Sequence, residues 1–216
     1  MNDNGKEAAA KKALRYVKNG MAVGLGTGST SAIFIRLLGE KNKKKSLELK
    51  CIATSLKSEQ LAKELELPLV GFEQMTQIDV AVDGADVIFG KLLIKGLGGG
   101  AIAREKAVDY RAKKFIVIAD KSKVKDEFKG TVPVEAIPFC SEAVKRELLF
   151  MGAERAEFRL GEGGSKFITD NGNHMIDAYF PAIKNAKKLE RELNNIPGVL
   201  ENGIFTRNCK VILGGV

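Results

Sequence analysis

Residues 21–39, MAVGLGTGSTSAIFIRLLG, contain the pattern that decides the fold. An apolar run (21–26) leads into a short turn, TGST, and then into a second apolar segment that ends at Gly39. The first run predicts a buried strand, and the second predicts a helix closed by its glycine. A strand followed through a tight turn by a helix is the repeating unit of an α/β protein.

The same alternation continues on both sides of this stretch. A helix is predicted over residues 6–18, where alanine, leucine and valine recur with helical spacing. Further strands are predicted at LELKCIAT (47–54), IDVAVDGAD (78–86) and KFIVIADKSK (114–123). Helices are predicted at SLKSEQLAKELEL (55–67), which has a serine cap, and AIAREKAVDYRAKK (101–114). Near-continuously apolar strands predict a parallel sheet that is covered on both faces.

The regular alternation of strands and helices changes near Thr131. Strand-like and helical segments then follow in the order β-α-β-β-α-β: TVPVEAIPF (131–139), SEAVKRELLFMG (141–152), AEFRLG (156–161), HMIDAYF (174–180), KNAKKLERELNNIPG (184–198) and VLENGIF (199–205). This order is typical of the ferredoxin-like arrangement. The last segment, CKVILGG (209–215), is a strand that can rejoin the first sheet.

We therefore predict an α/β protein with a Rossmann-like, mostly parallel sheet and a smaller α+β, ferredoxin-like domain inserted near the C-terminus. The predicted catalytic domain comprises residues 1–130 and 207–216, and the small domain comprises residues 131–206.

Composition narrows the class of protein. The net charge of +8, from 35 basic and 27 acidic residues, is spread over several lysine-rich stretches, which suits a solvated surface. Neither zinc-finger spacing nor an aromatic-rich strand that would stack bases is evident, so no nucleic-acid partner is expected. No apolar run approaches the roughly 18 residues of a membrane span. Three widely spaced cysteines suggest a reducing, cytoplasmic setting and no metal site.

Polar groups follow four of the predicted strands, and ligands of open α/β sheets collect at the carboxyl ends of strands. These groups lie in GTGST (26–30), DGAD (83–86), ADKSK (119–123) and the glycine-rich stretch KGLGGGAIARE (95–105). GTGST lacks the lysine of a Walker loop, and Ser29 replaces the third glycine of the dinucleotide fingerprint. Phosphate binding at a helix N-terminus is one interpretation of this loop, and a plain turn is the alternative.

Each motif also has a purely structural interpretation. Asp83 and Asp86 flank a Gly-Ala turn, where aspartate is common for local hydrogen-bonding reasons. Glu105 could be a surface residue of its helix, and we interpret His174, the single histidine, as structural. Proton transfer would then fall to carboxylates and lysine.

Seven motifs in this order resemble type A ribose-5-phosphate isomerases over essentially the whole chain: GLGTGST, DGAD, KG…GGGA…REK, IADKSK, PVEAIPF, TDNGN and IPGVLENGIF. The resemblance implies interconversion of D-ribose 5-phosphate and D-ribulose 5-phosphate without metal or cofactor. It also implies a small-molecule sugar phosphate as partner and a homodimer or homotetramer.

The resemblance assigns site residues by motif. Glu105 matches the catalytic base, with Asp83, Asp86 and Lys95 as further catalytic residues. Substrate-binding positions are Lys6, Thr27, Gly28, Ser29, Thr30, Gly84, Ala85, Gly96, Leu97, Gly98 and Lys123. An isomerase of this kind must stabilise an enediolate, and a glycine loop lets backbone N–H groups approach the developing oxyanion.

The chain departs from the family pattern at three positions. Val87 stands where an acid is usual, Ala103 stands where a threonine is common, and Leu97 interrupts and lengthens the glycine run. Two other functions remain as alternatives on this scaffold. One is a non-catalytic sugar-phosphate sensor, and the other is an amino-sugar phosphate deaminase, which would be expected to use a histidine near its site.

Overall fold

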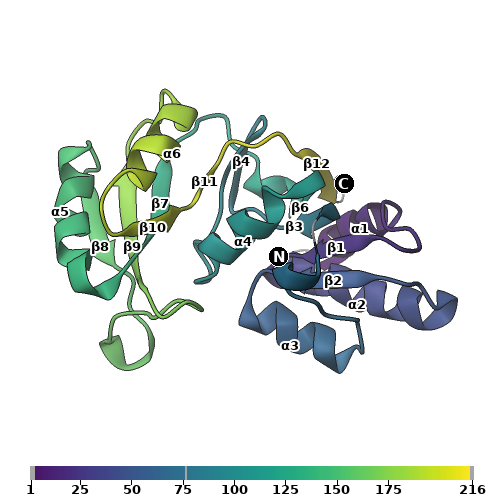
Figure 1. Ribbon diagram of the computed structural model, residues 1–216. Helices are drawn as coiled ribbons and strands as arrows, with labels where there is room; N and C mark the ends of the chain where they lie inside the picture. Colours follow the sequence, from purple (N-terminus) through teal and green to yellow (C-terminus); the bar gives the residue numbers. More distant parts are fainter. Residues whose placement is uncertain (1–2, 76, 215–216) are drawn as a thin grey trace. The chain divides into compact units, whose positions relative to one another are not determined.

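The computed structural model describes residues 3–75 and 77–214 (Figure 1). Contacts divide the chain into two units. The first unit comprises Met1–Ala85, Arg104–Lys123 and Asn208–Val216, and the second comprises Asp86–Ala103 and Val124–Arg207.

The first unit is built on a five-stranded parallel sheet in the order β12-β6-β3-β1-β2. Its strands are β1 (Ala22–Leu25), β2 (Lys50–Ala53), β3 (Ile78–Asp83), β6 (Ala112–Asp120) and β12 (Lys210–Gly214). The C-terminal segment therefore rejoins the first sheet as predicted, because β12 pairs with β6. The prediction of a parallel α/β sheet is confirmed.

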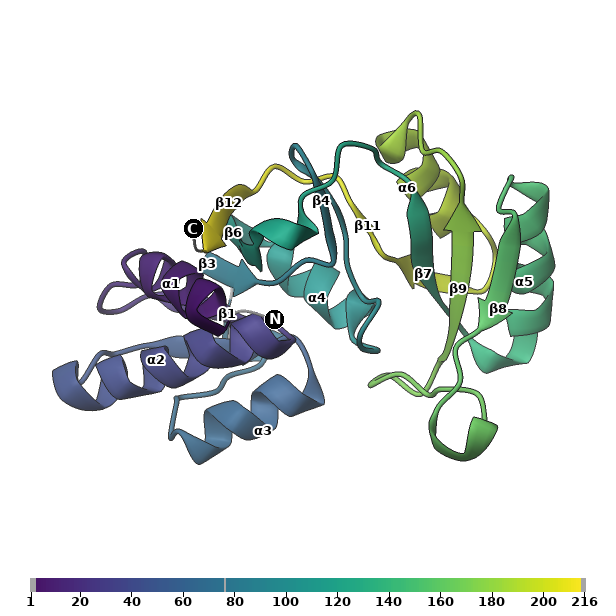
Figure 2. The same cartoon turned by 180° about the vertical axis from the view of Figure 1, so that it is seen from behind.

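Helices cover both faces of this sheet. One face packs against α1 (Asp3–Leu14), α2 (Ser29–Lys45) and α3 (Leu56–Glu64) through a shared apolar core (Figures 1 and 2). On the other face, Gly24 of β1 lies against Val108 of α4 (Ile102–Asp109), so closely that an added Cβ would lie 2.6 Å from the valine side chain. The predicted serine cap of α3 is present, since Ser55 Oγ accepts a hydrogen bond from Ser58 N–H at 3.1 Å.

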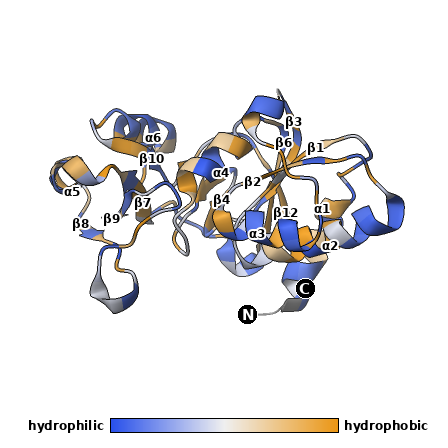
Figure 3. Ribbon diagram, turned by 60° about the horizontal axis from the view of Figure 1, so that its bottom comes forward, coloured by the Kyte–Doolittle hydropathy of each residue, from blue (hydrophilic) through white to orange (hydrophobic). Residues whose placement is uncertain are grey.

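The prediction that Gly39 closes the second helix is wrong. α2 continues to Lys45 and ends at Ser46, which has a left-handed φ of 46°. Gly39 is buried against Leu65, whose Cβ would lie 3.0 Å from an added Cβ, so this glycine serves close packing. The C-terminal part of α2, coloured as hydrophilic in Figure 3, also contacts the segment that follows α1, because Lys41 Nζ donates to Val17 O at 2.6 Å.

The second unit carries a four-stranded antiparallel sheet in the order β10-β7-β9-β8. The strands are β7 (Gly130–Ala136), β8 (Arg155–Phe158), β9 (His174–Phe180) and β10 (Val199–Asn202). α5 (Ser141–Phe150) and α6 (Ala186–Asn194) share an apolar core with one face of the sheet. The element order and strand order confirm the ferredoxin-like arrangement.

A three-stranded sheet, β11-β5-β4, was not predicted. β4 (Val87–Phe89) and β5 (Leu92–Ile94) have three residues each, and Val87 pairs with Ile94. The segment VLENGIF, predicted as one strand, is divided between β10 and β11 (Ile204–Phe205). Gly203 separates them because its backbone packs against Lys95 and Pro133, leaving no room for a Cβ.

Short 3-10 helices complete the described structure at Phe72–Gln74, Lys121–Lys123, Pro138–Cys140 and Glu162–Gly164. The contacts group residues 86–103 with the second unit, whereas the sequence-based division placed them in the first. The predicted boundaries of the two domains, at residues 130/131 and 206/207, stay a prediction. Within the described residues, no helix is both long enough and apolar enough to span a membrane.

Candidate functional site

Three of the four predicted polar loops lie at the carboxyl edge of the parallel sheet in the first unit. The first loop (residues 26–30) follows β1, the acidic turn begins at Asp83 in β3, and Lys121–Lys123 follow β6. Because β1, β3 and β6 are parallel neighbours, their ends meet at one edge. This is the usual ligand-binding edge of an open α/β sheet.

The buried carboxylate of Asp83 fixes the first loop. Its side chain is fully buried, and Oδ1 accepts hydrogen bonds from Thr27 N–H at 2.8 Å and Gly84 N–H at 2.6 Å. Ser31 Oγ, in the first turn of α2, donates to the same oxygen at 3.3 Å. Gly26 lies so close to this carboxylate that an added Cβ would be 2.3 Å from Oδ1. The glycine is therefore required for the loop to close over Asp83.

Hydroxyl groups hold the loop from its other side. Thr27 Oγ1 lies 2.8 Å from Thr54 Oγ1, and Thr54 Oγ1 donates to Leu25 O at 3.1 Å. Ser58 Oγ of α3 donates to Gly26 O at 2.6 Å. These bonds fix the entry of the first loop before any ligand binds.

The N-terminus of α2 is suited to an anion. Gly28 precedes the helix with φ 99°, a conformation that favours glycine, and the first turn carries no acidic residue. Ser29 is exposed and Thr30 is half-buried, so both side chains reach the surface. Unbonded N–H groups and the helix dipole favour a phosphate at such a position.

Two lysines and a glutamate complete the candidate residues of this unit. Lys6 lies within α1, and only 9% of its surface is exposed. Glu105 is in the first turn of α4 and is 6% exposed, whereas Lys123 is half-buried. Glu105 is therefore buried, in contrast to the structural interpretation, which made it a surface residue of its helix.

Asp120, at the end of β6, was not among the predicted site residues. The hydrogen bond from Ser122 N–H, at 2.8 Å, and the positive charge of Lys6 keep the pKa of Asp120 below its ordinary value. The sequence did contain a signal for Asp120, because it lies inside the ADKSK motif. An aspartate at the end of a strand and next to lysines is well placed to pair with a positive charge.

In the second unit, Lys95 directly follows β5 and leads into the glycine loop (residues 96–100). Lys95 is 2% exposed, its N–H donates to Gly203 O at 2.9 Å, and its Nζ lies 5.2 Å from the centre of the Phe205 ring. Gly96 has φ 91°, and an added Cβ would lie 2.1 Å from Ile102, so only glycine fits.

Asp86 and the inserted Leu97 are connected directly. Leu97 N–H donates to Asp86 Oδ2 at 2.9 Å, while the leucine side chain is 38% exposed. Asp86 itself is half-buried, in contrast to the fully buried Asp83. The two carboxylates of the DGAD turn therefore have different environments.

His174 has a structural environment in β9. Its Nδ1 lies 2.8 Å from Ser141 Oγ, and its ring meets Phe158 edge-on at 5.7 Å. Burial, together with the charge of Lys166, lowers the pKa of His174 below its ordinary value. Among the described residues, no three His, Cys, Asp or Glu side chains are grouped so as to hold a metal ion.

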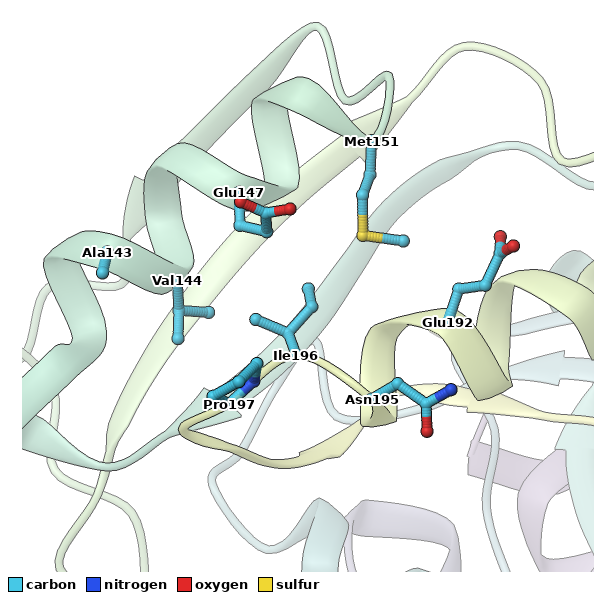
Figure 4. Close-up of a pocket in the computed structure, with 8 residues that line it drawn as sticks. All are labelled: Ala143, Val144, Glu147, Met151, Glu192, Asn195, Ile196 and Pro197. Carbon is cyan, nitrogen blue, oxygen red and sulfur yellow. The ribbon is translucent and has the colours of Figure 1, made fainter.

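A pocket between α5 and the end of α6 contains none of the predicted site residues (Figure 4). Met151 and Ile196 point into it, with Glu147 and Glu192 at its sides. Acidic groups at an apolar groove do not suit a phosphate, so this pocket is not a candidate for the anionic ligand.

The fold and the first loop define the class: α/β proteins with a parallel sheet whose carboxyl edge carries a loop and helix N-terminus suited to a small anion. The family model of ribose 5-phosphate isomerase A (phosphoriboisomerase A) matches residues 50–216. The chain belongs to the ribose-5-phosphate isomerase A family.

Relatives support this assignment over nearly the whole length. Ribose-5-phosphate isomerase A of Methanocaldococcus jannaschii is 46% identical, with 99% of this chain and 95% of the relative covered. The Pyrococcus horikoshii protein of the same name is 45% identical, with 97% and 93% covered. The solved M. jannaschii structure superposes with a TM-score of 0.95 at 45% identity, covering 100% of this chain and 96% of that one.

A second solved structure was determined with a ligand. This D-ribose-5-phosphate isomerase, in complex with phospho-erythronic acid, is 44% identical, has a TM-score of 0.92, and covers 98% of this chain and 96% of its own.

Proposed function

We propose that the chain interconverts D-ribose 5-phosphate and D-ribulose 5-phosphate through an enediolate, as in the non-oxidative pentose phosphate pathway. Relatives that carry this name at about 45% identity over nearly the full chain are the observation that carries the proposal. A relative solved with a phosphorylated sugar acid supports a sugar phosphate as the ligand. The proposal needs no cofactor.

Phosphate binding is assigned to the first loop. The N–H groups that begin α2, together with the hydroxyls of Ser29 and Thr30, would hold the phosphate, with Thr27 and Gly28 shaping the loop. Lys6 and Lys123 would add positive charge. Gly84 and Ala85 would border the sugar, because they continue the turn that begins at Asp83.

Proton transfer is assigned to Glu105. As a general base its carboxylate removes the proton from C2 of the open-chain aldose and delivers it to C1, giving the ketose. Its shielded position at the start of α4 supports this role, because a base works best where water does not compete. The negative charge that develops on O1 and O2 must be stabilised meanwhile.

Stabilisation of that charge is assigned to Lys95 and the glycine loop, with the backbone N–H groups of Gly96 and Gly98 as donors and Leu97 N–H holding Asp86. Hydrogen-bond donors and a positive charge fixed beforehand are the most effective stabilisers of an oxyanion. Asp86 is assigned to hydroxyl proton transfer and ring opening, because it is more exposed than Asp83. Asp83 is assigned to holding the first loop in place through its hydrogen bonds.

The test is formation of ribulose 5-phosphate from ribose 5-phosphate by the purified protein. Binding of ribose 5-phosphate without turnover would favour a sensor, and ammonia release from an amino-sugar phosphate would favour a deaminase. A homodimer or homotetramer and a cytoplasmic location remain part of the proposal. Size-exclusion chromatography with light scattering tests the former.

A further inference from the structure

Arg159 follows β8 and contacts the glycine loop through its guanidinium group. Its Nη1 donates to the carbonyl oxygens of Gly96, at 2.7 Å, and Gly99, at 2.5 Å. On its other side, Nε and Nη2 donate to the two carboxylate oxygens of Asp177 in β9, at 2.9 and 2.5 Å. One guanidinium thus joins a carboxylate to two carbonyls of the loop.

The pair is held firmly within the second unit. The side chains of Arg159 and Asp177 are only 13% and 28% exposed. Arg159 N–H donates to Met175 O, and its carbonyl accepts from Phe167 N–H, both at 2.8 Å. A bidentate arginine–carboxylate pair fixes the plane of the guanidinium, and the remaining donors are then fixed in direction as well.

This arrangement orients the peptide groups of the loop. In a trans peptide the C=O of one residue and the N–H of the next point in opposite directions, and the described chain has no cis peptide bond. Since the carbonyls of Gly96 and Gly99 point to Arg159, the N–H groups of Leu97 and Gly100 point away from it. The Leu97 N–H does so and donates to Asp86.

A hairpin holds the next carbonyl of the loop. Gly100 O accepts from Asp170 N–H at 3.2 Å, and Asp170 belongs to the turn formed by residues 169–173. Buried Glu135 fixes this turn, because its Oε1 accepts hydrogen bonds from Thr169 Oγ1 and from the side-chain amides of Asn171 and Asn173. The PVEAIPF and TDNGN motifs therefore support the same loop.

We propose that Arg159, oriented by Asp177, is a positioning residue that fixes the peptide planes of the glycine loop, so that Leu97 N–H holds Asp86 and Gly100 N–H is directed at the developing oxyanion. The proposal rests on the proposed isomerase function. Arg159 itself contacts the loop carbonyls and needs no contact with the substrate. A lysine at this position has a single charged nitrogen and cannot hold Asp177 and two carbonyls in one plane.

The test compares Arg159→Lys with Arg155→Lys. Arg155 begins β8, the strand that Arg159 follows, is exposed, and has its guanidinium 5.1 Å from the centre of the Tyr179 ring, so it controls for the same chemical change. We expect Arg159→Lys to lower kcat about 10- to 100-fold, as misplacement of a preorganised group by about 1 Å does. KM and competition by inorganic phosphate should change less than about threefold, because the phosphate contacts are elsewhere. Arg155→Lys should leave both unchanged.

Hydrogen exchange provides a measurement that does not depend on activity. The peptide covering residues 95–101 should exchange at least about tenfold faster in Arg159→Lys than in wild type or Arg155→Lys. Wild-type protein without isomerase activity would refute the proposed function, whereas the exchange result would still decide the positioning role.

Chemical rescue separates positioning from general stability. Arg159→Ala leaves a space for a guanidinium ion, so guanidinium chloride at low millimolar concentration should restore part of its kcat. The same salt should leave Arg155→Ala unaffected. If Arg159→Lys retains wild-type kcat, or if its loop exchanges at the wild-type rate, Arg159 has no positioning role.

Discussion

The backbone N–H of Thr27 donates to Oδ1 of Asp83 at 2.8 Å, so a fully buried carboxylate in β3 holds the loop that follows β1. Gly84 N–H and Ser31 Oγ donate to the same oxygen. A group that is so occupied organises the site, and its half-buried neighbour Asp86 is better suited to exchange protons with a substrate.

Substitution of the two aspartates should separate these duties. Asp83→Asn should lower the free energy of unfolding by about 1–3 kcal/mol, because several buried donors lose a charged acceptor. It should also weaken phosphate binding. Asp86→Asn should change stability by less than about 0.5 kcal/mol and chiefly lower kcat. Urea denaturation and steady-state kinetics provide the measurements, and equal destabilisation by both variants would contradict the division.

At Gly98 the glycine loop should tolerate a methyl group structurally but not functionally. An added Cβ at Gly98 would meet no atom within 4 Å, and its φ lies outside the left-handed region. Gly98→Ala should therefore keep the wild-type melting temperature but lower kcat/KM at least about tenfold, because the Cβ would obstruct substrate approach. Gly20→Ala is a poor control, since Gly20 has φ 73°.

Gly99→Ala is a second test of the same loop. It also has open space around an added Cβ, and its carbonyl is held by Arg159. If both alanine variants retain full activity, close approach of backbone to substrate is not the reason for these glycines.

The environment of His174 predicts a contribution to the pH dependence of stability. Burial lowers its pKa in the folded state below the ordinary 6.5, so from about pH 6.5 downward the unfolded chain binds a proton that the folded chain does not. The contribution of neutral His174 to the free energy of unfolding is fully present above pH 6.5. It falls as the pH decreases toward the lowered pKa of His174. His174→Gln should flatten the pH dependence of unfolding between pH 7 and 5. Parallel curves for variant and wild type would contradict the prediction.

The sequence allowed the prediction of the two larger sheets because strand and helix periodicities differ and most of the buried strands are almost continuously apolar. β1, β3 and β6 bury most of their residues, as does β7 of the small sheet, whereas buried and less buried positions are mixed in β9. The first loop and the acidic turn could be placed together because parallel strands end at one edge. Placing the two loops together requires only the order and direction of the strands, and no knowledge of side-chain contacts.

Other features depend on contacts that no local pattern contains. Gly39 has the sequence character of a helix stop, yet it lies inside α2 because Leu65 of a distant segment packs against it. The three-residue strands β4 and β5 are too short to show a period. Arg159 was missed because its partners, Gly96, Gly99 and Asp177, are brought together only by the tertiary fold.

Glu105 is the assigned general base, and its substitution by glutamine tests that role. Glu105→Gln keeps the size of the side chain and most of its hydrogen-bonding capacity but cannot accept the carbon-bound proton. General-base catalysis contributes about 10²–10⁴-fold, so kcat should fall by that order. Binding of a competitive sugar-phosphate inhibitor should change little, because the phosphate is assigned to the first loop. Glu40→Gln, on the exposed side of α2, is the matched control and should leave kcat unchanged.

The melting temperature decides between the catalytic and structural interpretations of Glu105. Its side chain is almost completely buried, so a structural role would appear as a large loss of stability in Glu105→Gln. A melting temperature close to wild type combined with a large fall in kcat would support the base. A variant that keeps more than about a tenth of wild-type kcat would remove Glu105 from proton transfer. Asp86 would then be the next carboxylate to test, because it is half-buried and already bonded to the glycine loop through Leu97 N–H.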